Sequence, residues 1–282
     1  MIILAESGSS KTDWCFIQDG VVVIQVSTIG LNPYFVDASG IAATIKEYVL
    51  PALELSQTIN NIYFYGAGCS TGRMCEIVNQ GLAVHFPKAI IEVQSDMIAA
   101  ARALCGDGTG IVSILGTGSN SCAYHEGKII EQSPALGYVL GDEGSGTDIG
   151  KRLLQSFCYK ELKPELQEAF ESKYKIKKDD VLESIYKKPF PNRYIASFVP
   201  FITEHPDASL STLVRIAFES FLKQHIGLYQ SLPADTPLYF TGSVANAFAG
   251  ILEEEIEKRK LTLGNIIQSP LEGLIKYHQR KV

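Results

Sequence analysis

One arrangement of strands and turns occurs twice in this chain of 282 residues, and it constrains the fold more than any other feature. Apolar runs predict three short strands near the start of the chain: Ile2–Ala5, Trp14–Gln18 and Val21–Val26. Runs of the same kind return later as Ile111–Leu115, Ser121–Tyr124 and Lys128–Ile130. In each copy a glycine loop follows the first strand, and an acid-glycine turn precedes the third, Asp19-Gly20 or Glu126-Gly127. Gly8 and Gly116 mark the two loops about 108 positions apart, so we predict a duplicated domain.

Helices and strands alternate after each group of three strands, which indicates an α/β fold with largely parallel sheets covered on both faces. The glycine-rich run 106–110 suggests the boundary between the copies. We therefore expect one domain over 1–106, a second over 107–269 with a helical insertion, and a C-terminal helix, 270–282, that packs back on the first. Three helices of the second domain are predicted as single pieces, Arg193–Thr203, Leu210–Leu232 and Ala245–Lys260, and Asp180 is predicted to begin another through a capping box with Glu183.

The composition is that of an ordinary globular chain, with 46% hydrophobic residues, 20% charged residues and a net charge of -6. This balance gives no reason to expect binding to nucleic acid or to an anionic membrane, and no apolar run reaches the roughly 18 residues of a membrane span. The six cysteines form no C-x-x-C pair, as is typical of free thiols in a reducing compartment. We therefore expect a cytoplasmic protein, and the sequence leaves open whether it forms a homodimer.

The two glycine loops are candidates for binding phosphate, because glycine lets backbone N–H groups approach a polyanion. Hydroxyl and amide donors accompany both loops, namely Ser9, Ser10, Thr12, Thr117, Ser119 and Asn120. Lys11 adds a positive charge. A plainer interpretation stays open at this point, since tight turns also use glycine for its conformation alone and Lys11 could be a solvated surface charge.

These features resemble the sugar kinase, Hsp70 and actin ATPase superfamily, and within it the N-acetylglucosamine kinase and BadF/BadG/BcrA/BcrD ATPase family. The segments Glu6–Trp14, Leu115–Asn120 and Thr241–Asn246 are similar to its two phosphate motifs and its adenosine motif. The run Gly141-Asp142-Glu143-Gly144-Ser145 is the most specific match. The resemblance implies two duplicated ribonuclease-H-like (actin-like ATPase) domains with a nucleotide and sugar cleft between them. It also implies ATP and Mg²⁺ as cofactors and a free amino sugar as acceptor, with N-acetylglucosamine, converted to its 6-phosphate, as the first choice.

The resemblance assigns roles to individual residues as well. Asp96 is the implied catalytic base and a sugar contact. The implied ATP and phosphate contacts are Gly8, Ser9, Ser10, Lys11, Gly116, Thr117, Gly118, Gly242, Ser243 and Asn246. The other implied sugar contacts are Asn32, Ser119, Asn120, Gly137, Tyr138 and Asp142. Glu6 is the residue that would hold Mg²⁺ through water.

Asp96 and Asn32 each have a simpler interpretation too. Asp96 follows the predicted strand Ala89–Gln94, where ligand sites of parallel sheets gather, yet Ser95 or Asp96 could merely cap the helix that starts there. Asn32 precedes Pro33 and could merely form a turn.

Several positions depart from the family pattern. Glu6 and Ser7 stand where Asp and Gly are usual, and Ser10 stands where Thr is common. Tyr138 and Val139 stand where Trp and Gly are usual in N-acetylglucosamine kinases, so glucosamine and N-acetylmuramic acid stay open as alternative acceptors.

Three other functions compete with the kinase interpretation. A BadF-type ATPase that activates a partner enzyme would place an iron–sulfur cluster between subunits, with Cys105, Cys122 and Cys158 as the candidate ligands. A dinucleotide-binding loop at 65–72, with Glu92 beyond it, has its third glycine one position late. A sensor that has lost catalysis would explain the changes at Glu6 and Ser7, but the presence of Asp96 argues against it.

Overall fold

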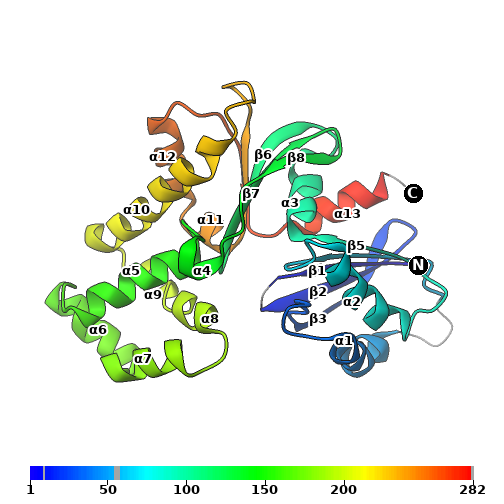
Figure 1. Ribbon diagram of the computed structural model, residues 1–282, viewed down its shortest axis with the longest axis horizontal. Coiled ribbons are helices and arrows are strands. Elements are labelled where there is room, and N and C mark those ends of the chain that lie inside the picture. Colours follow the sequence, from blue (N-terminus) through cyan, green and yellow to red (C-terminus); the bar gives the residue numbers. More distant parts are fainter. Residues whose placement is uncertain (9, 54–57, 281–282) are drawn as a thin grey trace. The chain divides into compact units, whose positions relative to one another are not determined.

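The computed structural model describes residues 1–8, 10–53 and 58–280, so Ser9, a predicted phosphate contact, lies outside the described residues. The chain divides into two compact units, Met1–Gly106 with Pro270–Val282, and Asp107–Ser269. Each unit contains one five-stranded sheet with helices packed against it (Figure 1). The predicted α/β class is thereby confirmed.

The sheet of the first unit has the order β3-β2-β1-β4-β5. Its strands are β1 Ile2–Ser7, β2 Lys11–Gln18, β3 Val21–Ile29, β4 Asn61–Gly66 and β5 Ile90–Ser95. The first three strands pair antiparallel, whereas β4 and β5 run parallel to β1. β1 is central, and its residues Ile3, Leu4 and Ala5 have no exposed area because both faces of the sheet are covered.

Different helices cover the two faces of this sheet. One face packs against α1 Ala38–Thr44, which continues as a π-helical turn over Ile45–Val49 and a 3₁₀ turn over Leu50–Ala52, and against α2 Gly72–Ala83. The other face packs against α3 Asp96–Cys105 and α13 Leu271–Gln279. In Figure 1 the last helix, drawn in red, lies beside α3. The two approach closely, since a Cβ on Gly273 would lie 2.5 Å from the carbonyl oxygen of Ala103.

The sheet of the second unit repeats this topology. Its order is β10-β9-β6-β7-β8, with β6 Thr109–Leu115 in the place of β1, β7 Ser119–His125, β8 Lys128–Gln132, β9 Leu238–Thr241 and β10 Leu263–Ile267. The hairpin turns match as well, because each pairs an acid and a glycine at positive φ: Asp19 (50°) and Gly20 (76°), Glu126 (46°) and Gly127 (84°). Such paired left-handed residues suit the twist of a two-residue hairpin. The predicted duplication is confirmed.

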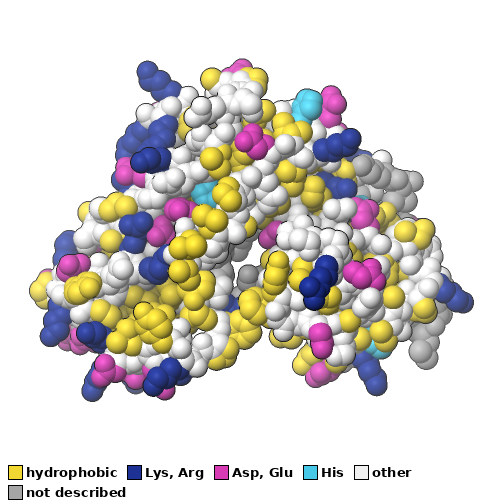
Figure 2. Space-filling model, viewed as in Figure 1, with side chains coloured by type: hydrophobic (Ala, Val, Ile, Leu, Met, Phe, Trp, Pro, Cys, Tyr) yellow, Lys and Arg dark blue, Asp and Glu magenta, His cyan; other side chains and the backbone are white. Residues whose placement is uncertain are grey.

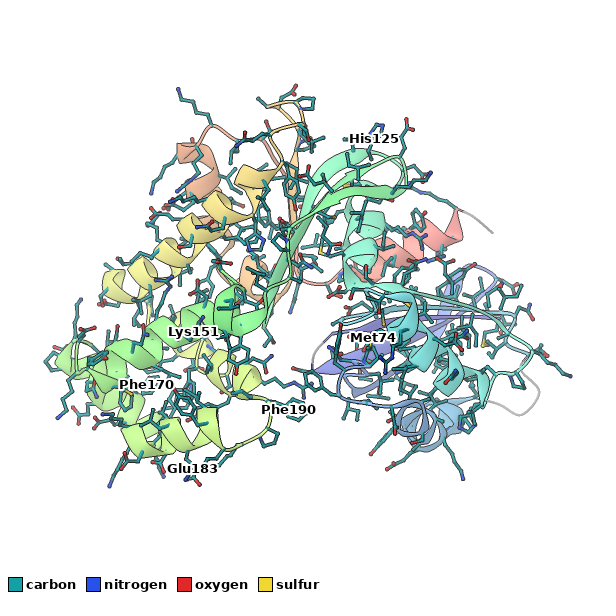
Figure 3. The ribbon with its side chains drawn as sticks, viewed as in Figure 1. Met74, His125, Lys151, Phe170, Glu183 and Phe190 are labelled. Carbon is teal, nitrogen blue, oxygen red and sulfur yellow. The ribbon has the colours of Figure 1, made fainter. Side chains whose placement is uncertain are left out.

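The helices of the second unit come between its strands in the sequence. They are α4 Gly137–Leu140, α5 Gly146–Cys158, α6 Pro164–Tyr174, α7 Lys178–Tyr186, α8 Pro191–Ala196, α9 Pro200–Glu204, α10 Ala208–Gln224, a 3₁₀ turn Ile226–Leu228, α11 Ser243–Ala247 and α12 Ala249–Lys258. Those from α5 onward contribute to one large apolar core. Phe170 on α6, marked in Figure 3, is fully buried and packs against Phe157, Phe198 and Phe201 with ring centroids 4.5 to 5.6 Å apart. Aromatic packing thus joins the helices α5, α6 and α9 and the turn between α8 and α9.

The helix predictions for this unit are partly wrong. The helix expected over Arg193–Thr203 is broken between α8 and α9, where Pro200 supplies no N–H to continue the ladder. The helix expected over Leu210–Leu232 ends at Gln224, and the one expected over Ala245–Lys260 is interrupted at Phe248. Asp180 does not begin α7; it lies in the first turn, and its carboxylate accepts the N–H of Lys177 at 2.8 Å.

Charged side chains of both signs intermingle on the face drawn in Figure 2, as 25 Lys and Arg against 31 Asp and Glu would lead one to expect. Across the described ranges, no helix combines the length and apolar character needed to cross a membrane.

Candidate functional site

Acidic side chains gather where the parallel strands of the first unit end. Glu6 pairs in register with Tyr65 on β4, and Tyr65 pairs with Gln94 on β5. Asp96 follows two residues after Gln94, as the first residue of α3. Because the carboxyl ends of parallel strands share one edge of a sheet, Glu6 and Asp96 belong to the same edge.

The two carboxylates are coupled electrostatically. Burial, followed by the charges of Asp96 and Asp13, raises the pKa of Glu6 to about 7, against an opposing effect of Lys11. Loss of water contact also raises the pKa of Asp96, while the N–H groups of Met97 and of Asp96 itself act in the opposite direction. One carboxylate oxygen, Asp96 Oδ1, accepts the N–H of Met97 at 2.9 Å. This edge therefore carries more negative charge than its own residues neutralise.

The helix-capping function belongs to Ser95. Ser95 is the N-cap of α3, and its Oγ accepts the N–H of Ile98 at 3.4 Å. Asp96 is already the first helical residue, so the fold does not depend on its side chain as the N-cap.

The β1–β2 loop is held by buried hydroxyl groups. Ser7 and Thr12 are fully buried, their hydroxyl oxygens lie 2.8 Å apart, and Ser7 Oγ also accepts the N–H of Leu31 at 3.0 Å. The serine at position 7 thus links the loop to the segment that precedes Asn32. Gly8 N–H closes the hairpin on the carbonyl of Lys11 at 2.9 Å, and Lys11 Nζ pairs with Asp13 at 2.7 Å. Ser10 is exposed at the tip.

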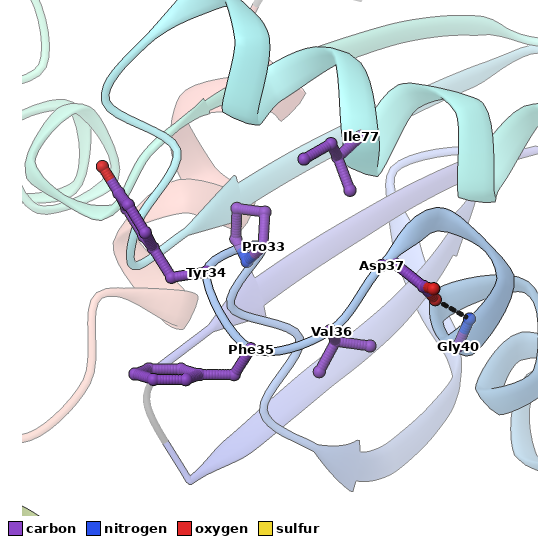
Figure 4. Close-up of a pocket in the computed structure, with 7 residues that line it drawn as sticks. All are labelled: Pro33, Tyr34, Phe35, Val36, Asp37, Gly40 and Ile77. Atoms are coloured by element: carbon purple, nitrogen blue, oxygen red, sulfur yellow. Dashed lines mark hydrogen bonds between the residues drawn. The ribbon is translucent and has the colours of Figure 1, made fainter.

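Asn32 forms the turn that its position before Pro33 suggests. Its Oδ1 accepts the N–H of Tyr34 at 2.9 Å, and a Cβ on Gly68 would lie 2.4 Å from the same oxygen. Asn32 is only partly buried, and its amide nitrogen forms no hydrogen bond with any described residue. The residues that follow it in sequence line part of a cavity of about 480 Å³ (Figure 4), whose lining residues are Pro33, Tyr34, Phe35, Val36, Asp37, Gly40 and Ile77.

The corresponding loop of the second unit joins β6 to β7. The N–H of Gly116 donates to the carbonyl of Gly118 at 3.0 Å, and the carbonyl of Thr117 accepts both the N–H and the hydroxyl of Thr147 at the start of α5. Gly116 has open space where a side chain would be, and neither Gly8 nor Gly116 has positive φ. Their backbones therefore do not require glycine for conformation, and each leaves room that a Cβ would fill.

The Gly-Asp-Glu-Gly run packs against the same loop. Asp142 has a left-handed backbone (φ 59°), and its Oδ1 accepts the N–H of Ser119 at 3.3 Å. Ser119 Oγ donates to the carbonyl of Glu143 at 2.7 Å. Burial raises the pKa of Asp142, and so does Glu143, against the lowering effects of Ser119 N–H, Lys151 and His225.

Tyr138 is held through its backbone. Gly137 and Tyr138 lie in the short helix α4, and Lys151 on α5, marked in Figure 3, donates from Nζ to the carbonyl of Tyr138 at 3.0 Å. Asn120 lies in β7, where its Oδ1 accepts the N–H of Ser121 at 2.9 Å. The amide nitrogen of Asn120, like that of Asn32, forms no hydrogen bond within the part of the chain that the structure describes, so both can act as donors.

Gly242 is required by the backbone. Its φ is 122°, and a Cβ there would lie 2.3 Å from the carbonyl oxygen of Leu115. Ser243 and Asn246 are exposed on α11, which starts directly after this glycine. The close approach places the start of α11 beside the end of β6 in the same unit.

Each unit thus brings its own predicted residues together. The first unit holds Glu6, Gly8, Ser10, Lys11, Asn32 and Asp96, and the second holds Gly116, Thr117, Gly118, Ser119, Asn120, Gly137, Tyr138, Asp142, Gly242, Ser243 and Asn246. The sequence did not single out His225, which contacts Glu143 across 82 positions. It ends a helix with a continuous apolar stripe, and no local pattern distinguishes it from a core residue.

The donor chemistry at Glu6 fits a weakly held divalent cation. No group of three or more His, Cys, Asp or Glu side chains in the described ranges is arranged as a metal site. Mg²⁺ often keeps several waters and takes only one or two carboxylates besides substrate phosphates. Burial and then the charges of Asp96 and Asp13 raise the pKa of Glu6, and a nearby cation would favour its ionised form.

Comparison with solved structures places the chain among known proteins. It aligns over 99% of its length with 99% of a Porphyromonas gingivalis protein provisionally named an N-acetylglucosamine kinase, at 43% identity and a TM-score of 0.94. A Chromobacterium violaceum protein with the same provisional name shares the fold at 19% identity over 98% of both chains and a TM-score of 0.75. A Streptomyces griseus ROK glucokinase, solved with glucose and AMPPNP, shares it at 14% identity over 98% of this chain and 97% of that one, with a TM-score of 0.57.

No protein-family model matches the chain, and no curated protein matches it. The 43% identity over nearly the whole of both chains is nevertheless enough to assign relationship. The chain therefore belongs to the N-acetylglucosamine kinase and BadF/BadG/BcrA/BcrD ATPase family of the sugar kinase, Hsp70 and actin superfamily.

Proposed function

We propose that this protein is an ATP-dependent sugar kinase that transfers phosphate to O6 of N-acetylglucosamine. The observation that carries the proposal is Asp96, a carboxylate of raised pKa at the end of β5 that the fold does not need as a helix cap. Membership of a family that includes a provisionally named N-acetylglucosamine kinase supports the choice of acceptor.

Asp96 is the proposed general base. Its carboxylate orients the sugar hydroxyl and accepts its proton while the hydroxyl oxygen bonds to the γ-phosphorus and the bond from that phosphorus to the β,γ-bridging oxygen breaks. ADP leaves, and the proton passes from Asp96 to water. Burial suits this role because it raises the pKa of Asp96 and so makes the carboxylate a better proton acceptor.

The glycine loops are the proposed phosphate contacts. Gly8 and Gly116 are not required by backbone conformation, which favours a role in admitting a ligand. The hydroxyls of Ser10 and Thr117 accompany them, with Gly118 beyond, and Ser9 belongs to the same proposal. Gly242, Ser243 and Asn246 are proposed for the adenosine end of the nucleotide.

The proposed sugar contacts are Asn32, Asp96, Ser119, Asn120, Gly137, Tyr138 and Asp142. Asn32 and Asn120 each have the amide oxygen engaged by a backbone N–H, so both would present N–H donors to a hydroxyl or acetyl oxygen. The carboxylate of Asp142 would accept hydrogen bonds from sugar hydroxyl groups. Glu6 would hold Mg²⁺ through water, and the cation when bound would offset the charge of the phosphates.

No specific observation favours the ATPase alternative. Cys105 lies in the first unit, whereas Cys122 and Cys158 lie in the second, and Cys122 is fully buried in β7. Burial raises the pKa of Cys105 to about 12 and, against the lowering effect of Lys178, also raises the pKa of Cys158, which is unlike cysteines held ready as cluster ligands.

The test is an ADP-release assay with glucosamine, N-acetylglucosamine and N-acetylmuramic acid, and with no sugar. We expect the highest kcat/KM with N-acetylglucosamine. Asp96→Asn should lower kcat by about 10²- to 10⁴-fold with little change in sugar affinity. Ser95→Ala is the matched control, since it removes the true N-cap, costs about 1 kcal/mol of stability and should leave turnover nearly intact.

Three results would contradict the proposal. Near wild-type turnover by Asp96→Asn would show that Asp96 is not the base. Turnover that does not depend on sugar would favour the ATPase, and tight sugar binding without turnover would favour a sensor.

A further inference from the structure

A chain of buried hydrogen bonds runs through the second unit from the Gly-Asp-Glu-Gly loop to β7. Glu143 Oε2 lies 3.2 Å from His225 Nε2, and His225 Nδ1 lies 3.0 Å from Ser133 Oγ. Ser133 Oγ in turn accepts the N–H of Ser121 in β7 at 3.2 Å. His225 and Ser133 are 5% and 4% exposed, whereas the Glu143 side chain is 28% exposed. The chain of hydrogen bonds therefore joins a partly exposed carboxylate to strand β7 through a closed interior.

The protonation of this chain follows from burial. Burial lowers the pKa of His225, while Glu143 and Asp142 act in the opposite direction, so the imidazole is neutral and carries one N–H. A carboxylate can only accept, so we assign that proton to Nε2, directed at Glu143. Nδ1 then accepts the hydroxyl proton of Ser133. Both ring nitrogens are thus satisfied, which fixes the tautomer.

The imidazole ring has little freedom to turn. It follows the end of α10 and stacks on Phe221, with ring centroids 4.5 Å apart and ring planes at 20°. Tyr229 Oη lies 2.7 Å from Ser121 Oγ and accepts the N–H of Ser133 at 3.1 Å. These two contacts fix the hydrogen-bond chain at its β7 end. Rigid surroundings of this kind are what position a side chain for binding.

The carboxylate that His225 holds has no cationic partner. Among the ion pairs of the described ranges, none joins a lysine or arginine to Asp142 or Glu143, and Lys151 is directed at the carbonyl of Tyr138. Asp142 keeps a left-handed backbone, with φ at 59°, and such backbone conformations are typical of functional loops. Carboxylates arranged in this way are suited to accept hydrogen bonds from the hydroxyl groups of a polyol.

We propose that Glu143 is a second sugar-binding carboxylate beside Asp142, and that His225 is its positioning residue. The proposal rests on the proposed kinase function, which supplies the sugar. His225 does not touch the substrate; it fixes the Glu143 carboxylate in one orientation. Ser133, whose Oγ accepts the N–H of Ser121, ties the same support to β7, the strand that carries Asn120.

The test compares His225→Leu with His205→Leu. His205 is a matched control because it also follows a helix end and stacks on a phenylalanine four residues earlier, Phe201, at 4.1 Å, but its Nδ1 faces a backbone carbonyl. We expect His225→Leu to raise the KM for sugar about tenfold, equivalent to about 1.4 kcal/mol, with the KM for ATP changed less than about twofold. His205→Leu should change neither. His225→Gln keeps an N–H donor, so it should recover most of the sugar affinity, and it carries the test if the leucine variant does not fold.

A double variant shows whether His225 acts through Glu143. In the Glu143→Gln background, the further change His225→Leu should leave the KM for sugar unaltered, because the carboxylate is already gone. Additive effects, or equal rises in both KM values, would overturn the proposal while leaving the kinase function intact. If the wild-type protein neither phosphorylates nor binds an amino sugar in a calorimetric titration, the proposed function fails and this inference fails with it.

Discussion

Gly116→Ala separates a phosphate-binding loop from an ordinary turn. A Cβ at Gly116 would have no heavy atom within 4 Å, and its φ is not positive, so alanine fits the fold. By restricting the unfolded chain, the change should raise the free energy of unfolding by about 0.4–1 kcal/mol. A phosphate lying against the bare loop would meet the added methyl group. Loss of one hydrogen bond to a charged group costs about 1.5–3 kcal/mol, which is about a 10- to 150-fold rise in the KM for ATP.

The assay measures the KM for ATP at saturating sugar, together with urea unfolding of the same preparation. Gly250→Ala in α12 is the matched control, because that position also has open space and no positive φ, and it should gain a similar stability with no change in the KM for ATP. A folded Gly116→Ala protein whose KM for ATP equals that of the wild type would refute the assignment of this loop to phosphate.

Three further predictions concern stability. Glu255 has no exposed area, and its burial alone would raise its pKa. Hydrogen bonds from Lys258, Arg215 and Arg259 outweigh the effect of burial and lower the pKa to about 2. Glu255→Gln should therefore lower the free energy of unfolding by about 3 kcal/mol at pH 7. The contribution of Glu255 is present above its ordinary value of 4.5 and should be lost as the pH falls from 4.5 towards 2, and a variant with wild-type acid unfolding would contradict this. The pH dependence that Glu6 contributes has the opposite sign, because its pKa of about 7 lies above its ordinary value of 4.5. The free energy of unfolding of the wild type should therefore decline as the pH rises from 4.5 to 7. Denaturant titrations of Glu6→Gln should show a smaller decline over the same range. Gly242→Ala combines positive φ with a clash against Leu115 and should cost about 3 kcal/mol or more, read as a lower denaturation midpoint; full wild-type stability would show that the loop can move aside.

The sheets could be predicted because their signals are local. Alternating apolar residues and the acid-glycine turns specify each hairpin within about twenty residues of sequence, and both turns have the expected left-handed pair. The helix ends were less predictable, since the apolar stripe of α10 continues past Gln224 although the helix does not. His225, the C-cap residue, stacks on Phe221 and contacts Glu143, and a helical period does not reveal such tertiary contacts.

The candidate site also combines residues that local motifs predict with contacts that depend on long-range packing. Gly8, Gly116, Asp96 and Asp142 could be proposed from short motifs, and the structure adds what each contacts. The structure also explains the serine at position 7, which the sequence alone does not, because its buried hydroxyl joins the loop to Leu31. The pairing of Glu143 with His225 spans 82 positions and depends on how α10 packs, so no spacing rule could have found it.

The return of α13 to the first unit bears on the order in which a growing chain can fold. A ribosome makes Asp107–Ser269 before it makes Leu271–Gln279, so the second unit has all its residues while the first still lacks Leu274 and Tyr277. Until then Leu4, Cys15 and Ile17 have part of their apolar cover missing. Residues translated after the second unit thus complete the core of the first, and a nascent chain released before Leu274 is made would carry a finished second unit and an open first one.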